Sequence, residues 1–296
     1  FGHALLEHDE DAEGLRHLDL ALSRRPAHFR AALIKGHHLL SRGRAAEALT
    51  ALEPATLHAR DTQLEHVTLL SHVIAAVEAG EPARADRSLE RLAAVPPRPP
   101  EIFAIRLAPE FSARTHRALG GLCRSRRDRL GAGDALATSL EASARAAAAR
   151  ASEAAGQALR AGDHARAIGE ADAALSGLDA YGLEEPAVRL NLLGARSTAA
   201  FSLGRHQDAA RDLEAALRLN DQSRPDLKLR AAFDNYNLAV ARASVQPVDR
   251  EAVLAALERA ASLGFDRGEV VRQQPALAPF LDDPRMKAVL SKMSGR

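Results

Sequence analysis

Histidine is the residue type that first suggests chemistry in this sequence, because twelve histidines occur and nine of them precede residue 73. A helix that binds a metal usually presents ligands three or four residues apart, so that both imidazoles reach one ion. No two histidines have this spacing; His37 and His38 are adjacent, and His66 and His72 are six residues apart. We therefore expect no metal site, and we expect the histidines to lie on the surface or between helices.

The single thiol, Cys123, is the next candidate for chemistry. It follows His116 by seven residues, a spacing that can place both on one helix face, and the neighbouring arginines could lower its pKa. A thiolate nucleophile also needs an oxyanion hole and a group that orients its base, and the sequence shows neither. In addition, Gly120 and Gly121 could break the helix between the two residues. We expect an inert, buried thiol, no catalytic residue and no enzyme.

A basic segment between Arg114 and Arg129 departs from the balanced charge of the chain. Six arginines lie there against one acid, Asp128: Arg114, Arg117, Arg124, Arg126, Arg127 and Arg129. Proteins that read single-stranded nucleic acid interleave aromatics for stacking, and none lies between Phe111 and Tyr181. We favour a solvated helix face, or a patch for an acidic partner at Arg124, Arg126 and Arg127. No glycine-rich phosphate-binding motif occurs, so we expect no nucleotide cofactor.

Composition narrows the class of protein. Sixty-four alanines against 3% aromatics and no tryptophan favour helices, because strands draw on β-branched and aromatic residues. The net charge of +1 gives no general reason to expect nucleic acid or membrane binding, and no apolar run is long enough to span a bilayer. One cysteine favours a reducing compartment, the cytoplasm. Four lysines among forty basic residues suggest a bacterial source, and the first residue, Phe1, suggests a piece of a longer protein.

One spacing pattern recurs and predicts pairs of helices. A glycine, which readily adopts the left-handed conformation that ends a helix, or in one instance an aspartate, is followed at offsets of 5, 9 and 12 by small or apolar residues on one helix face. In the clearest example, helices at 190–203 and 206–219 are predicted to pack antiparallel around Gly204. The instances are Asp9, Gly14, Leu18 and Ala21; Gly43, Ala48, Leu52 and Ala55; Gly80, Ala85, Leu89 and Leu92; Gly162, Ala167, Ala171 and Ala174; and Gly204, Ala209, Leu213 and Ala216.

This pattern resembles the tetratricopeptide repeat (TPR), a helix-turn-helix unit of about 34 residues. The first two instances are 34 residues apart. The resemblance covers about residues 1–97 and 148–296, and it implies an all-α, right-handed solenoid of about six helical pairs. The tail resembles the segment that closes many bacterial repeat arrays, with Pro275, Leu277, Pro279, Asp283 and Pro284 at the matching places. Such a segment caps the apolar end of the array.

Four segments are predicted along the chain. Residues 1–97 form an N-terminal TPR-like segment with a truncated first repeat, which ends at the helix-breaking sequence VPPRPP at 95–100. Residues 98–133 form a diverged helical hairpin. Residues 134–272 form a second TPR-like segment that opens with a long helix from the N-cap Asp134 to Arg160. Residues 273–296 form the cap.

The resemblance also implies where a partner binds, since the first helix of each pair lines a concave groove in this family. It places Asn191, Thr198, Phe233 and Asn237 toward that groove. We expect a protein-interaction or regulatory scaffold module of a larger bacterial protein, which binds a protein or peptide. The basic residues that clamp a C-terminal carboxylate in family members are not matched here. The alternatives are an enzyme built on helical hairpins and RNA binding through the segment from Arg114 to Arg129.

Overall fold

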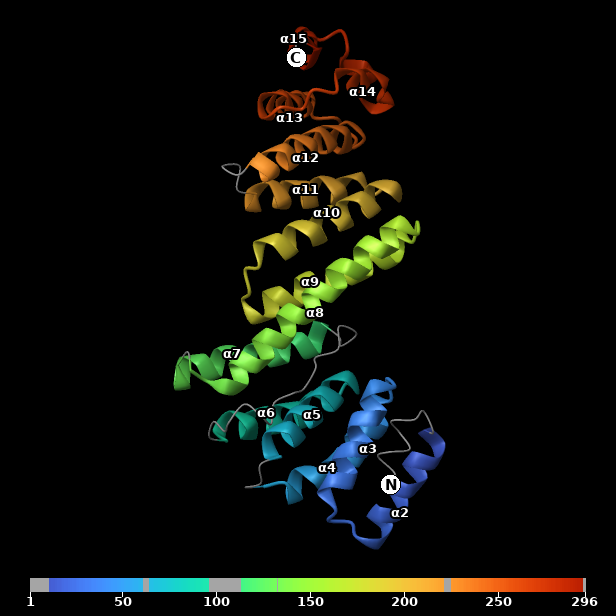
Figure 1. Ribbon diagram of the computed structural model, residues 1–296, viewed down its shortest axis with the longest axis vertical. Coiled ribbons are helices and arrows are strands. Elements are labelled where there is room, and N and C mark those ends of the chain that lie inside the picture. Colours follow the sequence, from blue (N-terminus) through green and yellow to red (C-terminus); the bar gives the residue numbers. More distant parts are fainter. Residues whose placement is uncertain (1–10, 61–63, 96–112, 132, 221–224, 295–296) are drawn as a thin grey trace. The chain divides into compact units, whose positions relative to one another are not determined.

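The described chain is helical throughout. The structure is a computed structural model, and it describes residues 11–60, 64–95, 113–131, 133–220 and 225–294, within which there is no strand (Figure 1). No helix within those ranges is both long and apolar enough to cross a membrane. Successive helices pack against each other in pairs. The segment Phe1 to His8 and residues 98–112, which are part of the predicted hairpin, lie outside the described residues.

The chain divides into two compact units. Unit 1 comprises residues up to Ala147 together with Ser176–Leu183, and unit 2 comprises Ala148–Leu175 together with Glu184–Arg296. The helices of unit 1 are α2 (Asp11–Arg24), α3 (Phe29–Ser41), α4 (Ala45–His58), α5 (Glu65–Glu78), α6 (Pro82–Ala94) and α7 (Ala113–Leu130). Two helices contribute residues to both units, α8 (Ala135–Arg160) and α9 (His164–Tyr181).

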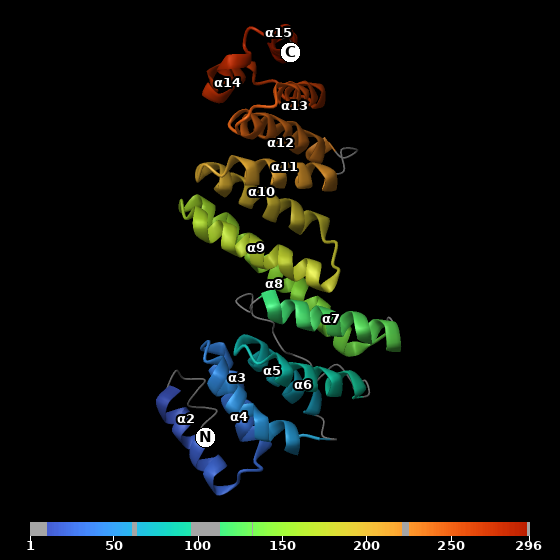
Figure 2. The ribbon, with the colours of Figure 1, turned by 180° about the vertical axis from the view of Figure 1, so that it is seen from behind.

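Unit 2 continues with helices that follow one another in sequence and in space. They are α10 (Pro186–Ser202), α11 (His206–Leu219), α12 (Pro225–Ala243), α13 (Arg250–Leu263), α14 (Gly268–Gln273), the short 3-10 helix η2 (Pro275–Phe280) and α15 (Pro284–Ser294). In both views α12 lies between α11 and α13 (Figure 1, Figure 2). Each helix therefore packs mainly against its sequence neighbours, which is the arrangement that a repeated helical hairpin predicts.

The glycines of the recurring pattern end helices, as predicted. Positive φ angles of 71°, 77°, 76° and 73° occur at Gly43, Gly80, Gly162 and Gly204. Each of these glycines lies between two consecutive helices. At Gly204 the flanking helices run antiparallel, because two contacts between them pair residues at decreasing distances from the turn. Arg196 pairs with Asp212, and Phe201 packs edge-on against His206. The helix pair predicted at 190–203 and 206–219 is thus confirmed as α10 and α11.

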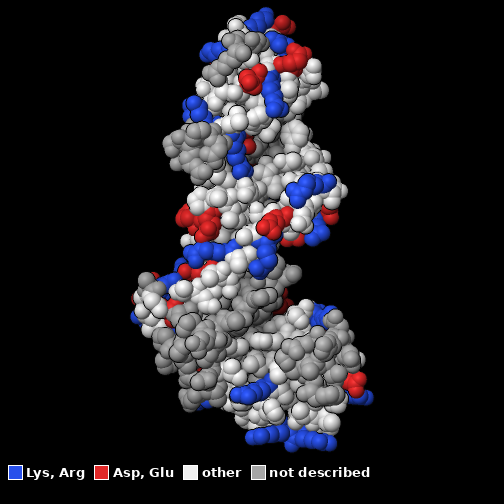
Figure 3. Space-filling model, viewed as in Figure 1, with Lys and Arg blue, Asp and Glu red and all other residues white. Residues whose placement is uncertain are grey.

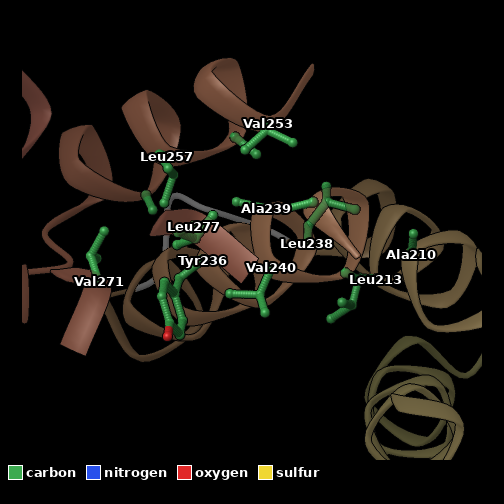
Figure 4. Packing of buried hydrophobic residues seen from close by; sticks show 14 of the residues in the cluster. Ala210, Leu213, Tyr236, Leu238, Ala239, Val240, Val253, Leu257, Val271 and Leu277 are labelled. Atoms are coloured by element: carbon green, nitrogen blue, oxygen red, sulfur yellow. The ribbon is translucent and has the colours of Figure 1, made fainter. Parts of the chain in front are cut away.

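The C-terminal helices close the core of unit 2. Leu254 and Leu257 of α13 are 3% and 0% exposed. Apolar residues of the segment after Gln273 belong to the same core: Leu277, Phe280, Met286, Val289, Leu290 and Met293. Asp283 caps α15 by accepting a hydrogen bond from the backbone N–H of Arg285 at 2.9 Å. Figure 4 shows Leu257, Val271 and Leu277 gathered around α12. Apolar residues of the C-terminal segment therefore pack into the core of unit 2.

Helix α7 corrects one expectation, because it runs through Gly120 and Gly121 without a break. Here glycine serves close packing. A Cβ on Gly120 would lie 2.0 Å from the carbonyl oxygen of Ala180, a distance that no side chain tolerates. α7 and the end of α9 therefore touch backbone to backbone within unit 1. The long helix that follows begins as predicted, since Asp134 accepts a hydrogen bond from the N–H of Ala137 at 3.1 Å.

Candidate functional site

A pocket of about 180 Å³ in unit 2 is the best candidate for a binding site. Its lining combines apolar side chains of α11 and α12 and Phe201 with hydroxyl and amide groups. The lining residues are Ser197, Thr198, Phe201, Ser202, Ala209, Leu213, Tyr236, Asn237, Val240 and Gln274. Three helices and the residue that precedes η2 therefore contribute to one concavity. Phe201 is exposed at 36%, although large apolar side chains of this unit are mostly buried.

Hydrogen bonds join α12 to α10 seven residues before Asn237, the first α12 residue after Tyr236 that lines the pocket. Arg230 of α12 donates a hydrogen bond to Asn191 of α10, and seven residues further along both helices Asn237 and Thr198 line the pocket together. The hydrogen-bonded residues Asn191 and Arg230 are 39 positions apart in sequence, and so are the lining residues Thr198 and Asn237. This equal spacing is what two parallel helices would give. Residues seven apart on each helix then form one continuous row.

The structure brings together two of the four residues predicted to face a groove, Thr198 and Asn237, and both are exposed in the pocket. Asn191 is exposed on the same face of α10, but its Oδ1 accepts a hydrogen bond of 3.0 Å from Arg230. Phe233 is half-buried. It packs edge-on against Phe265, with ring centroids 5.1 Å apart, and the Arg267 guanidinium lies 5.0 Å from its centroid. Phe233 thus contributes to the unit 2 core.

The pocket is electrically neutral, since none of its lining residues is charged. Arg196, which precedes the lining residue Ser197, is engaged elsewhere. It donates to Asp212 at 2.8 Å and 2.6 Å and to Asp172 at 2.5 Å. Its pKa is raised, because those carboxylates outweigh the effect of burial. On the face drawn in Figure 3, basic and acidic side chains are interspersed over unit 2. The site therefore suits an uncharged group.

The basic segment of unit 1 differs from the patch that the sequence suggested. Arg126 is 0% exposed and forms a two-armed ion pair with buried Asp134, at 2.7 Å and 2.8 Å. It also donates to the carbonyl of Leu92 at 2.8 Å. Arg127 pairs with Glu141 at 2.9 Å, and Arg124 donates to the carbonyl of Ala180. Arg126 is therefore a structural residue and no part of a surface for an acidic partner, because it is buried and its charge is paired with that of Asp134.

Cys123 lies in an environment that disfavours a thiolate. It is 1% exposed, and burial, followed by the charges of Glu141 and Asp134, raises its pKa to about 12. His116 is also buried, and burial lowers its pKa. Its ring packs edge-on against Tyr181, with centroids 6.3 Å apart.

Cys123 is expected to react with a thiol reagent at neutral pH only as fast as the protein unfolds. A thiol with a pKa near 12 is almost wholly protonated at pH 7, and the thiolate is the reactive form. The check is labelling by a maleimide with and without denaturant. Complete labelling of the folded protein within minutes would contradict this expectation.

The histidines take structural positions. His72 is buried between Glu53, 3.2 Å from its Nε2, and Ser88, 3.0 Å from its Nδ1. Burial lowers the pKa of His72, against the opposing effect of Glu53. His37 contacts Ser71, and burial lowers its pKa as well. Within the described ranges, no three His, Cys, Asp or Glu side chains are grouped so that they could hold a metal ion.

Comparisons with known proteins add little to this geometry. No family model matches the chain, and no curated protein matches it. Among solved structures, one match is the TPR2AB-domain:pHSP90 complex of yeast Sti1, with 13% sequence identity and a TM-score of 0.30. The match covers 99% of this chain and 95% of that chain. A likeness with a TM-score of this size supports no conclusion about function.

Sequence reasoning missed several polar members of the site. Ser197, Ser202 and Gln274 line the pocket, and Arg230 and Asp234 lie on the same helix as Asn237. Spacing would have found some of them. Arg230 and Asp234 precede Asn237 by seven and three residues, which places all three on one helix face. Gln274 carries no such signal, because its position depends on how the C-terminal segment folds back.

Proposed function

We propose that the chain is a protein-interaction module that binds an extended peptide segment of a partner, with one apolar side chain of that peptide in the pocket of unit 2. We also propose that the helical pairs belong to a right-handed solenoid of TPR type. The observation that carries the function is the pocket itself, whose lining combines apolar side chains with neutral hydrogen-bonding groups. This is the usual division of roles in a binding site, where apolar contact gives affinity and a few polar groups orient the ligand.

The size of the pocket supports a peptide side chain over a small-molecule ligand. Sites for small molecules usually enclose about 300–1,000 Å³, and this pocket measures about 180 Å³. Asn237 and Gln274 each offer a donor and an acceptor, as a peptide group requires. The absence of charge from the lining supports an uncharged side chain as the occupant, because a charged group would lose its hydration without gaining a partner.

Two observations favour this proposal over the alternatives. For an enzyme centred on Cys123, burial opposes formation of the nucleophile. For RNA binding through the basic segment, Arg126 is buried and Arg127 is paired with an acid. Nucleic acid is bound chiefly through basic side chains that neutralise phosphates. Each arginine that is buried or paired with an acid is unavailable for this role, which weakens that alternative.

Replacing Ser202 with tryptophan is expected to weaken peptide binding by about tenfold or more, equal to about 1.4 kcal/mol or more. The indole would occupy the pocket that the peptide side chain needs, while the fold stays intact because Ser202 is exposed. Random peptides displayed on phage are first selected on the immobilised 296-residue chain, and the affinity of a selected peptide is then measured for both proteins.

Ser262→Trp is the matched control. Ser262 is likewise an exposed serine near the end of a helix, and like Ser202 it donates its hydroxyl to a preceding backbone carbonyl. It does not line the pocket. Selection of no peptide at all, or equal affinities for the two tryptophan variants, would refute the proposed site.

A further inference from the structure

Asp234 of α12 is a carboxylate that the fold leaves short of hydrogen-bond donors. Its side chain is 13% exposed, and its buried Oδ2 accepts no hydrogen bond from the residues that the structure describes. Burial raises the pKa of Asp234, and the nearby Arg230 offsets this only in part. Leaving a buried carboxylate without donors costs stability. Such a group in a native protein calls for an explanation.

Arg230 is placed to satisfy Asp234 but points its donors elsewhere. It lies one helical turn away, and its Nε is 3.8 Å from Oδ2, which is too long for a hydrogen bond. Its two terminal nitrogens donate instead to Asn191 Oδ1 at 3.0 Å and to the carbonyl of Leu190 at 2.6 Å. The positive charge of Arg230 therefore lies near the carboxylate of Asp234, but Arg230 donates no hydrogen bond to Oδ2. A neutral donor fits such a site better than a second cation.

The neighbouring helix supplies no such donor. Asp234 follows Arg230 by four residues, and the residues three and four positions after Asn191 on α10, Gly194 and Ala195, have no polar side chain. A Cβ on Gly194 would lie 3.0 Å from Arg230 Nη2, so a larger residue would disturb the arginine. Arg230, Asp234 and Asn237 thus follow one another along one face of α12, and Asn237 lines the pocket.

We propose that Asp234 accepts a hydrogen bond from a main-chain N–H of the bound peptide, beside the residue whose side chain fills the pocket. This rests on the proposed function. Asp234 and Asn237 are three residues apart, about 4.5 Å along the helix axis, and an extended peptide advances about 3.3 Å per residue. The donor is therefore the N–H of the residue next to the anchored one. Rotation about χ2 lets the carboxylate present either oxygen.

The test uses N-methylated versions of a peptide selected on the wild-type chain, because N-methylation removes one main-chain donor at a time. Methylation at one position adjacent to the anchored residue is expected to weaken binding to the wild type by about tenfold, the effect of losing a hydrogen bond to a charged group. Asp234→Ala is expected to bind the unmethylated peptide about tenfold more weakly and to be insensitive to that methyl group, since the two changes remove one interaction.

Asp266→Ala, which removes an exposed acid of the same unit, is the control and should change neither affinity nor the methylation profile. Equal methylation effects in wild type and Asp234→Ala would overturn the inference, as would selected peptides that place Lys or Arg at this position. Loss of the Ser202→Trp effect would instead overturn the proposed function. Thermal melting of both alanine variants completes the test. Asp234→Ala should melt no lower than Asp266→Ala, and a lower melting temperature would show that the carboxylate is structural.

Discussion

Replacement of Arg126 with methionine will lower the free energy of unfolding of unit 1 by about 3–5 kcal/mol, the usual cost of removing one partner of a buried ion pair. Methionine fills much of the same volume but leaves the 0% exposed carboxylate of Asp134 without the two hydrogen bonds that the guanidinium donates. It also removes the donor to the carbonyl of Leu92. Chemical denaturation of the full chain, followed by circular dichroism, measures the loss.

The double variant Arg126→Met/Asp134→Ser separates charge from packing. Serine can still cap α8 as Asp134 does through the N–H of Ala137, so the double variant removes both charges and keeps the cap. It should recover much of the lost stability, because an apolar replacement for a whole buried pair is often neutral. If the double variant is as unstable as the single one, the buried charge is not the cause.

The pair also predicts how unit 1 responds to acid. Burial raises the pKa of Asp134, but the hydrogen bonds from Arg126 and Ala137 outweigh burial, so the pKa in the folded state is lowered. The pair's contribution to stability is therefore complete above the ordinary aspartate pKa of about 3.9. It is lost as the pH falls through the lower folded value.

Deletion of residues 273–296 will abolish the cooperative unfolding of unit 2. Six large apolar side chains leave the core: Leu277, Phe280, Met286, Val289, Leu290 and Met293. At about 1.5–3 kcal/mol for each buried side chain, the loss is on the order of 10 kcal/mol, comparable with the total stability of a typical domain. Leu254 and Leu257 also become exposed, so the truncated chain should associate.

Calorimetry and size-exclusion chromatography check this result, and two neighbouring residues give a point-mutation control. Met286 is 0% exposed, so Met286→Ala should cost about 2–5 kcal/mol. Lys287 lies beside it on the surface, and Lys287→Ala should change stability by no more than about 0.5 kcal/mol. A truncated chain that melts like the full chain and stays monomeric would show that the segment is not a cap.

Much of the helical order was predictable from sequence because the signals are local. A glycine such as Gly204 ends a helix through its own backbone preference, and Asp134 starts one through its own side chain. The same local rule failed at Gly120, where glycine is required by contact with Ala180, sixty residues away in sequence. A glycine inside a helix costs about 1 kcal/mol of helix stability relative to alanine. The close packing of α7 against α9 outweighs this cost.

The candidate site was predictable only in part for the same reason. Thr198 and Asn237 could be assigned to one face because repeats place equivalent residues alike, and the pocket brings them together. The roles of Asn191 and Phe233 depend on particular neighbours, Arg230 and Phe265, which no spacing reveals. Arg126 looked like a surface charge because a run of arginines says nothing about which of them finds a buried acid.

The burial of the one cysteine gives the chain a practical property. Since the Cys123 thiol is shielded and held protonated at neutral pH, a cysteine introduced on the surface would be the only thiol that reacts readily in the folded protein. A probe could therefore be attached at a chosen position without first removing the native residue. Labels placed one in each unit, by pairing two such positions, would report the distance between the units in solution and its change when a peptide binds.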